Sequence, residues 1–254
     1  MSVGQDVTYT ADGMTMVGHL ARPDGDGPWP AVLIGHDGVG LDAYQRGRAD
    51  ILADHGYATF AMDFHGGRTY FGEPGPMLDR TMPLLDDPGR MLAIGRTALD
   101  ILLAVPGVDH RRLAALGFGA GGRIVLELAS GGTPFAAAAL IHPALPPAAS
   151  ARDWAGVPGA FLLCTGSEDP LCTPAQLLTF GTVLHEAGVD WRVEVFGGAQ
   201  HAFWAVEASA QGTAGDTPGP VSTVPGVGYH AGAARRAWDA ALRHLHDEVP
   251  PGRP

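Results

Sequence analysis

Two segments of the sequence carry residues that together could form a general base. Asp169 lies in the segment TGSEDP and His201 in the segment GGAQHAF, and an apolar run precedes each of them. An aspartate that holds one imidazole nitrogen leaves the other nitrogen free to remove a proton from a reacting group. We therefore interpret His201 as a candidate base and Asp169 as the residue that orients it.

A glycine-rich run earlier in the chain has two interpretations. The stretch LAALGFGAGGRIVLELA passes from an apolar run through Gly117–Gly122 into a helix-like segment. As G-x-G-x-x-G it would be a dinucleotide-binding loop, which belongs in the first βαβ unit and needs an acidic residue about 20 residues later. The run instead lies mid-chain, and the next apolar run ends in LIH at 140–142 without a carboxylate. These two mismatches favour a nucleophile elbow, G-x-nucleophile-x-G, in which Gly119 stands where a serine or cysteine would be.

The chain resembles the dienelactone hydrolase family of α/β-hydrolases from about Pro30 onward. The matching segments are the glycine-rich elbow, GHDGVGL, TGSEDPLCTP, GGAQHAFW and the closing YHAGAARRAWDAALRHL. The resemblance implies a triad of Cys or Ser with Asp and His, in which Asp169 and His201 fill the acid and base positions. The nucleophile position falls on Gly119, and a residue without a side chain cannot form an acyl-enzyme.

The rest of the implied machinery is present. Backbone N–H groups of Gly38 and Ala120 would form an oxyanion hole. Asp37 stands in a loop where many family members carry a glutamate, and two roles stay open for it: a second acid or base, or a cap that holds the loop and the following helix. The expected function is an enzyme that acts on a small carbonyl, ester or lactone compound through His201, by direct water attack or by a lyase, isomerase or cyclase step.

Two other functions remain open, and they depend on the remaining polar residues. One is a catalytically dead protein that binds a small molecule; the other is an esterase with an unrecognised nucleophile. Cys164 and Cys172 are expected to pack in the core, and Ser167 lies on the acid side of the site. Asp63 is interpreted as a structural acid at a strand end. His36 is interpreted mainly as a loop-packing histidine.

Several further side chains are candidates for lining a substrate pocket, each with a packed or solvated position as the alternative. Relatives carry an arginine shortly after the catalytic histidine, and residues 202–205 contain none, so the resemblance does not extend to a carboxylate-bearing substrate. Aromatic residues at 203 and 204 favour an apolar or aromatic one. The candidate substrate-binding residues are His36, His65, Tyr70, Phe71, Arg80, Phe203 and Trp204.

The elements that must position these residues follow an alternating pattern. Short apolar runs alternate with helical patterns, which predicts one α/β domain over residues 1–254, with a mostly parallel sheet of about eight strands and helices on both faces. A hairpin is expected to turn at Asp12-Gly13. Residues 66–88 and 208–228 are expected to be loops, and a lid role for the second is left open. The other expected strands are 31–36, 57–64, 113–118, 135–141, 160–165 and 191–196, and the expected helices are 44–55, 89–103, 120–129, 174–187 and 231–246.

The composition narrows the classes of partner. The chain has 254 residues, a net charge of −11 and no lysine, and its longest basic cluster is an arginine pair, which argues against nucleic-acid binding. No apolar run reaches roughly 18 residues and no leader pattern is visible, so we expect a cytoplasmic protein without a membrane span. No metal-ligand spacing or cofactor motif is present, and the expected partner is a small-molecule substrate. Homodimerisation is left open.

Overall fold

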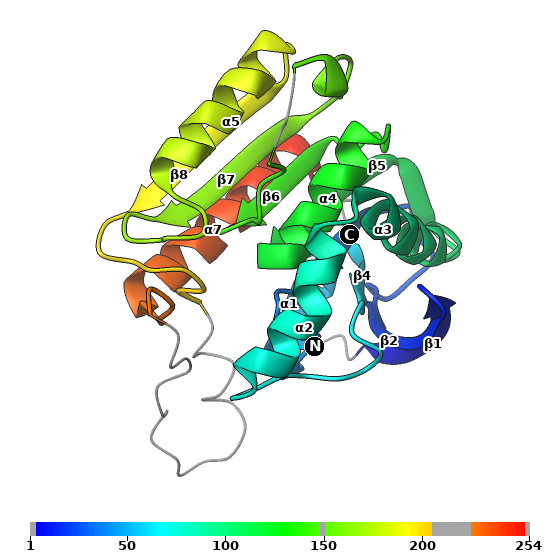
Figure 1. Cartoon of the computed structure of the whole chain (residues 1–254). Coiled ribbons are helices and arrows are strands. Elements are labelled where there is room, and N and C mark those ends of the chain that lie inside the picture. Colours follow the sequence, from blue (N-terminus) through cyan, green and yellow to red (C-terminus); the bar gives the residue numbers. More distant parts are fainter. Residues whose placement is uncertain (1–3, 148–150, 205–224, 252–254) are drawn as a thin grey trace.

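A computed structural model describes residues 4–147, 151–204 and 225–251. An eight-stranded sheet runs through it in the order β1-β2-β4-β3-β5-β6-β7-β8 (Figure 1). Neighbours from β4 to β8 in this order pair in parallel, whereas β1 with β2 and β2 with β4 pair antiparallel. The α/β-hydrolase architecture expected from the sequence, with about eight mostly parallel strands, is confirmed.

The bounds of the elements agree with the sequence pattern to within a few residues, apart from the segment discussed below. The strands are β1 (Gln5–Ala11), β2 (Met14–Ala21), β3 (Trp29–Gly35), β4 (Ala58–Met62), β5 (Val108–Phe118), β6 (Ala137–Ile141), β7 (Ala160–Gly166) and β8 (Asp190–Phe196). The helices are α1 (Ala43–Asp54), α2 (Pro74–Leu85), α3 (Pro88–Leu103), α4 (Gly119–Ser130), α5 (Pro174–Glu186) and α7 (Ala231–Glu248), with a 3-10 turn η1 at Ala151–Trp154.

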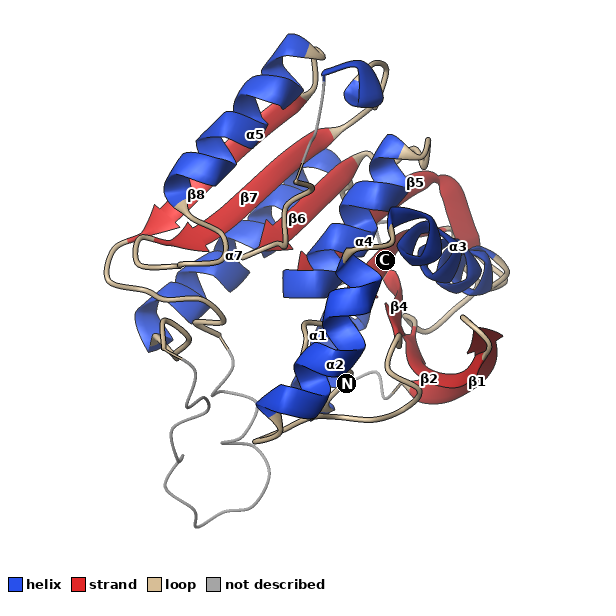
Figure 2. Ribbon diagram, in the orientation of Figure 1, coloured by secondary structure: helices blue, strands red, loops and turns tan. Residues whose placement is uncertain are grey.

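Helices cover both faces of the sheet (Figure 2). The buried side chains of α1 and α7 form one hydrophobic cluster with one face of the strands, and those of α3, α4 and α5 form a second cluster with the other face. Along β3, Val32 and Ile34 belong to the first cluster and Leu33 to the second. A strand buried on both faces needs apolar residues at every position, which explains the continuous apolar runs of the central strands.

The N-terminal hairpin turns where the sequence predicts. Ala11 of β1 pairs with Met14 of β2, and the two residues between them have positive φ angles, 55° at Asp12 and 67° at Gly13. A two-residue turn of this kind matches the twist of the flanking strands. The Asp-Gly pair therefore sets the register of the whole hairpin.

The prediction of a loop over residues 66–88 is wrong, because α2 occupies much of it. The segment is rich in Gly and Pro, which suggests a loop, but Pro74 lies in the first turn of α2, where a missing N–H breaks no hydrogen bond. Leu84 then packs into the cluster beneath α3 and α4. A helix therefore forms here against the Gly- and Pro-rich local composition, with one buried apolar side chain to anchor it.

The carboxyl ends of the parallel strands meet along one edge of the sheet, which is where such folds place their chemistry. Among the described residues, no helix has an apolar stretch long enough to cross a bilayer, and no group of three His, Cys, Asp or Glu side chains could hold a metal ion. The expected loop at 208–228 lies mostly outside the described residues. The residues that follow the strands at this edge are, from β3 to β8, Asp37, Asp63, Gly119, His142, Asp169 and His201.

Candidate active site

The two residues expected to form a general base are in contact. Nδ1 of His201, after β8, lies 2.9 Å from Oδ2 and 3.1 Å from Oδ1 of Asp169, after β7. Asp169 is buried, and His201 is partly exposed. A carboxylate at Nδ1 holds the proton on that nitrogen and leaves Nε2 as the basic atom.

Backbone groups fix both members of this pair. The N–H groups of Leu171 and Cys172 each donate to Oδ1 of Asp169 at 2.8 Å. Burial alone would raise the pKa of Asp169, but the hydrogen bond and the charge of His201, with these N–H donors, bring it below its ordinary value. The backbone of His201 is held by Gly226 and Gly228, through bonds of 2.9 and 3.0 Å. The carboxylate is thus ionised, and the imidazole is held in one place.

Gly119 occupies the turn between β5 and α4 with a φ angle of +48°. This left-handed conformation strains a residue with a side chain but not glycine. A Cβ atom built on Gly119 would lie 3.4 Å from Cβ of Asp37 and 3.4 Å from Cε1 of His142, which are ordinary contact distances. The site therefore keeps the backbone shape of an elbow and room for a small side chain.

The glycines around Gly119 are explained by close packing between strand and helix. A Cβ at Gly121 would lie 2.2 Å from the carbonyl carbon of Gly35, and one at Gly117 would lie 2.5 Å from Cα of Gly122. Gly121 also donates its N–H to the carbonyl of His36 at 2.8 Å. The run thus places α4 directly against β3 and β5 and needs no bound phosphate to account for it.

Two backbone N–H groups were expected to form an oxyanion hole beside this turn. Ala120 is the second residue of α4, and the first N–H groups of a helix have no partner within the helix. Gly38 lies in the loop between β3 and α1, next to Asp37. Both groups lie at the expected edge of the sheet, and their role stays a prediction.

Asp37 is buried beside the elbow. Its Oδ1 accepts a hydrogen bond of 2.9 Å from the N–H of Val39. Burial, with the negative charge of Asp42 nearby, raises the pKa of Asp37 to about 7. The bond to Val39 fits the interpretation of Asp37 as a residue that holds its loop. The raised pKa fits the other interpretation, a second acid or base, because such a group can exchange protons near neutral pH.

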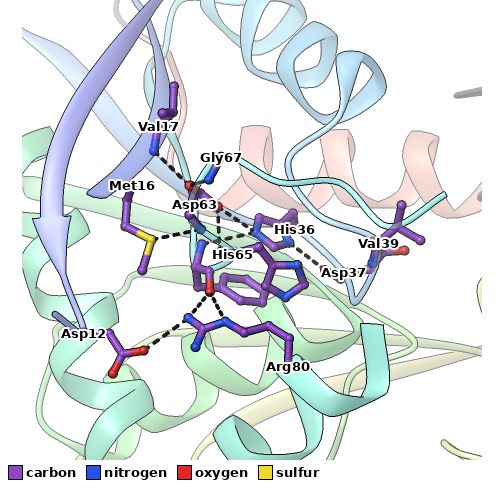
Figure 3. A network of polar contacts seen from close by, with 12 residues as sticks. Asp12, Met16, Val17, His36, Asp37, Val39, Asp63, His65, Gly67 and Arg80 are labelled. Carbon is purple, nitrogen blue, oxygen red and sulfur yellow. Dashed lines mark hydrogen bonds and ion pairs between the residues drawn. The ribbon is translucent and has the colours of Figure 1, made fainter. Parts of the chain in front are cut away.

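A second polar cluster at the ends of β3 and β4 is structural (Figure 3). Asp63 accepts hydrogen bonds from the N–H groups of Val17 and His65, at 2.8 and 2.7 Å. His36 is fully buried; its Nδ1 bonds the carbonyl of Asp37 at 2.6 Å, and its ring stacks on a phenylalanine at 3.6 Å. Arg80 bonds the carbonyl of residue 64 and pairs with the aspartate of the hairpin turn. These partners account for His36 and Arg80 within the fold, and a substrate contact by either stays a prediction.

Three other predicted lining residues stand beside this cluster. His65 is buried, its ring lies edge-on to Tyr70 with centroids 5.1 Å apart, and burial lowers its pKa to about 2. Tyr70 is also buried, and its N–H bonds the carbonyl of Val39 at 2.8 Å. Phe71 is 48% exposed. A substrate contact by any of the three stays a prediction.

The sequence analysis missed His142, which follows β6 between the elbow and the base. It is fully buried, and its ring centroid is 4.5 Å from that of His201. Its Nε2 accepts a hydrogen bond from the indole N–H of Trp204. The available signal was a polar residue at the carboxyl end of a central parallel strand. Phe203 is fully buried in the core, and Trp204 is buried against His142, so a substrate contact by either stays a prediction.

The three groups considered from the sequence as alternative nucleophiles have structural partners. Cys164 is buried in β7 and Cys172 beside Asp169, and burial raises the pKa of both thiols, that of Cys172 to about 12. Ser167 accepts a hydrogen bond of 2.8 Å from the N–H of Gly198. These groups have structural surroundings, as the sequence predicted for the cysteines.

Comparison with known proteins gives a consistent result. The model of the dienelactone hydrolase family matches residues 16–249. A dienelactone hydrolase-like promiscuous phosphotriesterase from metagenomic libraries superposes with a TM-score of 0.84 and 29% identity, over 97% of this chain and 98% of that chain. The protein m3DLH superposes with a TM-score of 0.81 and 34% identity, over the same shares. A protein of Aquifex aeolicus, named as a candidate carboxymethylenebutenolidase, is 26% identical over 209 residues, which are 79% of this chain and 87% of that protein.

Proposed function

The chain belongs to the dienelactone hydrolase family, and we propose that it is an enzyme that acts on a small carbonyl, ester or lactone compound without a covalent nucleophile. The observation that carries the proposal is the Asp169–His201 pair, which keeps its hydrogen bond of 2.9 Å beside an elbow whose side chain is absent. A decayed site has no need to keep a buried carboxylate ionised and aligned with an imidazole.

Hydrolysis would proceed by direct attack of water. His201 Nε2 takes a proton from the water as its oxygen forms a bond to the carbonyl carbon, and the C=O electron pair moves to the oxygen. N–H groups of Gly38 and Ala120 would stabilise that oxyanion. When the intermediate collapses, the bond to the leaving oxygen breaks and the imidazolium returns its proton to that oxygen. The products are an acid and an alcohol, and a lactone gives both in one molecule.

The same groups also fit non-hydrolytic steps. Removal of a proton beside a carbonyl by His201, with the enolate held by the same N–H groups, would begin an elimination, an isomerisation or a ring closure. Asp37, with a pKa raised to about 7, is proposed as the second acid–base group in either reaction.

A binding protein is the main competing function, and the glycine at position 119 is the observation that favours it. Such a protein would use the same space for a ligand and would not need the basicity of His201. The third candidate, an esterase with another nucleophile, lacks support because Cys164 and Cys172 are buried with raised thiol pKa values.

Turnover of activated esters and lactones by four proteins tests the proposal: the parent, His201→Ala, Gly119→Cys and the double variant. We expect His201→Ala to lose about 10²–10⁴-fold in kcat/KM, the usual contribution of a general base. We expect Gly119→Cys to form an acyl adduct, detected by intact mass, that needs His201. His185→Ala is the matched control, because it removes an exposed imidazole at the end of α5.

The outcomes separate the three functions. A parent rate that His201→Ala leaves unchanged would refute general-base catalysis. A parent without turnover, together with a Gly119→Cys variant that is acylated, would favour the binding protein with intact geometry. An acyl adduct on the parent itself would support an unrecognised nucleophile.

A further inference from the structure

The space beside Gly119 is bordered by an imidazole edge that the proposed reaction leaves without a role. A Cβ atom at residue 119 would lie 3.4 Å from Cε1 and 3.6 Å from Nδ1 of His142. The ring centroids of His142 and His201 are 4.5 Å apart, with the planes at 69°. The position where the family carries its nucleophile thus lies next to His142, whose ring in turn lies beside that of His201, the histidine bonded to Asp169.

Hydrogen bonding fixes where His142 carries its proton. The indole N–H of Trp204 donates to Nε2 of His142, and because an indole is a donor only, Nε2 must be the acceptor. An imidazolium would turn a second N–H toward the indole, so the ring must be neutral with its proton on Nδ1. Burial, with the charge of His201 nearby, also holds the pKa of His142 well below its usual range.

The direction of this Nδ1–H group is fixed as well. Trp204 is packed between Tyr44 and Phe118, with ring centroids at 4.8 and 5.0 Å. The backbone N–H of His142 bonds the carbonyl of Cys164 at 2.8 Å. Among the residues that the structure describes, Nδ1 has no hydrogen-bond partner. A buried donor without a partner costs about 1–3 kcal/mol, which a ligand oxygen would recover.

We propose that the Nδ1–H of His142 binds an oxygen atom beside Gly119, and that this is the oxygen from which His201 removes a proton. In hydrolysis the oxygen belongs to the attacking water. One lone pair accepts from His142, one hydrogen is donated to Nε2 of His201, and the other lone pair attacks the carbonyl carbon. In a non-hydrolytic reaction the oxygen is a hydroxyl of the substrate. The inference rests on the proposed function and assigns to a neutral imidazole the positioning that a covalently attached side chain provides elsewhere in the family.

A structural comparison tests the binding site independently of turnover. Crystal structures of the parent and of Gly119→Ala, without and with an alcohol-bearing substrate analogue such as benzyl alcohol, would show whether an oxygen is bound. We expect an ordered oxygen about 3 Å from Nδ1 of His142 in the parent. We expect the alanine methyl group to displace it. No ordered oxygen in either parent crystal would overturn the inference.

Kinetics then test whether the donor contributes to the reaction. His142→Phe removes the N–H group, whereas His142→Asn keeps an N–H donor at the same number of bonds from Cα and tolerates the positive φ of 40° at this residue. Both variants lose the bond to Trp204, and the phenylalanine variant also carries a side chain that the positive φ strains, so urea unfolding is measured for each variant beside its rate. We expect kcat to fall by about 100-fold in the phenylalanine variant, as for an oxyanion-hole donor. The asparagine variant should stay within about 10-fold of the parent, because it keeps one such bond.

The outcomes distinguish this inference from the function on which it rests. If both His142 variants lose rate only in proportion to their loss of stability, His142 has a packing role alone. This holds even if His201→Ala abolishes turnover. If the parent shows the ordered oxygen but no turnover, the oxygen-binding site is supported and the proposed catalytic function is refuted. A glycine control checks the first experiment: Gly188→Ala adds the same methyl group at a φ of +77° with no atom within 4 Å.

Discussion

Two clusters of aspartate and histidine lie at the same edge of the sheet, and they differ in what their polar atoms bond. Around Asp63, the carboxylate is surrounded by backbone N–H donors, and His36 bonds the backbone at its Nδ1. Around Asp169, the carboxylate aligns His201, and Nδ1 of the neighbouring His142 lacks a described partner. In the first cluster the fold satisfies Asp63 and His36, although both ring nitrogens of the neighbouring His65 also lack a described partner. In the second cluster the unpartnered nitrogen of His142 lies beside Gly119.

The comparison teaches that residue type alone does not identify a site. Both clusters follow parallel strands, and both contain a buried carboxylate with a lowered pKa: about 2 for Asp63, where His36 and N–H donors outweigh the effect of burial. The difference lies in the partners of the two carboxylates: backbone N–H groups bond both oxygens of Asp63, whereas Oδ2 of Asp169 bonds the imidazole of His201, which is partly exposed. The three predictions below test that difference.

The largest expected effect comes from Asp169→Asn. The asparagine oxygen can keep the bonds from Leu171 and Cys172, while its NH₂ group faces Nδ1 of His201 and favours the wrong tautomer. We expect kcat/KM to fall by about 10³–10⁴-fold, as tautomer reversal does in a triad, with a stability change below about 1 kcal/mol. Ester turnover and urea unfolding measure the two quantities. A rate within threefold of the parent would place this pair among the structural contacts.

Asp63→Asn should give the opposite pattern. One carboxylate oxygen accepts from His65, and the other from Val17 and Gly67, so the amide must leave backbone donors unpaired. We expect the free energy of unfolding to fall by about 2–4 kcal/mol, with kcat/KM of the folded protein changed less than about threefold. A large loss of kcat/KM without a loss of stability would show that Asp63 belongs to the active site, and the two clusters would then not differ in function.

Asp37 contacts both clusters, and the pH dependence of stability and of kcat tests whether its carboxyl group acts in the reaction. Its carbonyl bonds His36, while its side chain lies beside Gly119. Because its pKa rises from 3.8 to about 7 on folding, the folded state binds the proton more tightly. Its ionisation should therefore lower stability as pH rises from about 4 to 7, by up to about 1.4 kcal/mol per unit, with no further change above.

Urea unfolding of the parent and Asp37→Asn across this range isolates the effect, because titrations common to both proteins cancel. The difference should be flat below pH 4 and above pH 7. If kcat also changes near pH 7 in the parent and not in the variant, Asp37 acts in the reaction. A flat stability difference throughout would show that its carboxyl is not desolvated.

Much of the site was predictable because its information is local. The order of apolar runs places Asp169 and His201 at adjacent strand ends, and the glycine spacing identifies the turn at Gly119. The Asp-Gly turn of the hairpin is likewise encoded by two residues. Each of these features depends on backbone rules that act over a few positions.

The features that escaped prediction depend on partners distant in sequence. The ion pair of Arg80 with Asp12, on the hairpin turn, joins residues 68 positions apart. His142 gained its fixed tautomer from Trp204, which lies 62 residues later. The helix α2 formed despite its prolines, with Leu84 packed into the core while Leu78 and Met82 stay exposed. Such outcomes are tertiary, and a single sequence does not contain the geometry that decides them.

The room beside Gly119 also has a genetic consequence. Glycine codons of the form GGY become cysteine codons TGY or serine codons AGY by one base change. The backbone already has the left-handed φ of +48°, and a Cβ atom meets no clash. From a GGY codon, a single base change would therefore place a thiol or hydroxyl side chain at this turn without a steric clash.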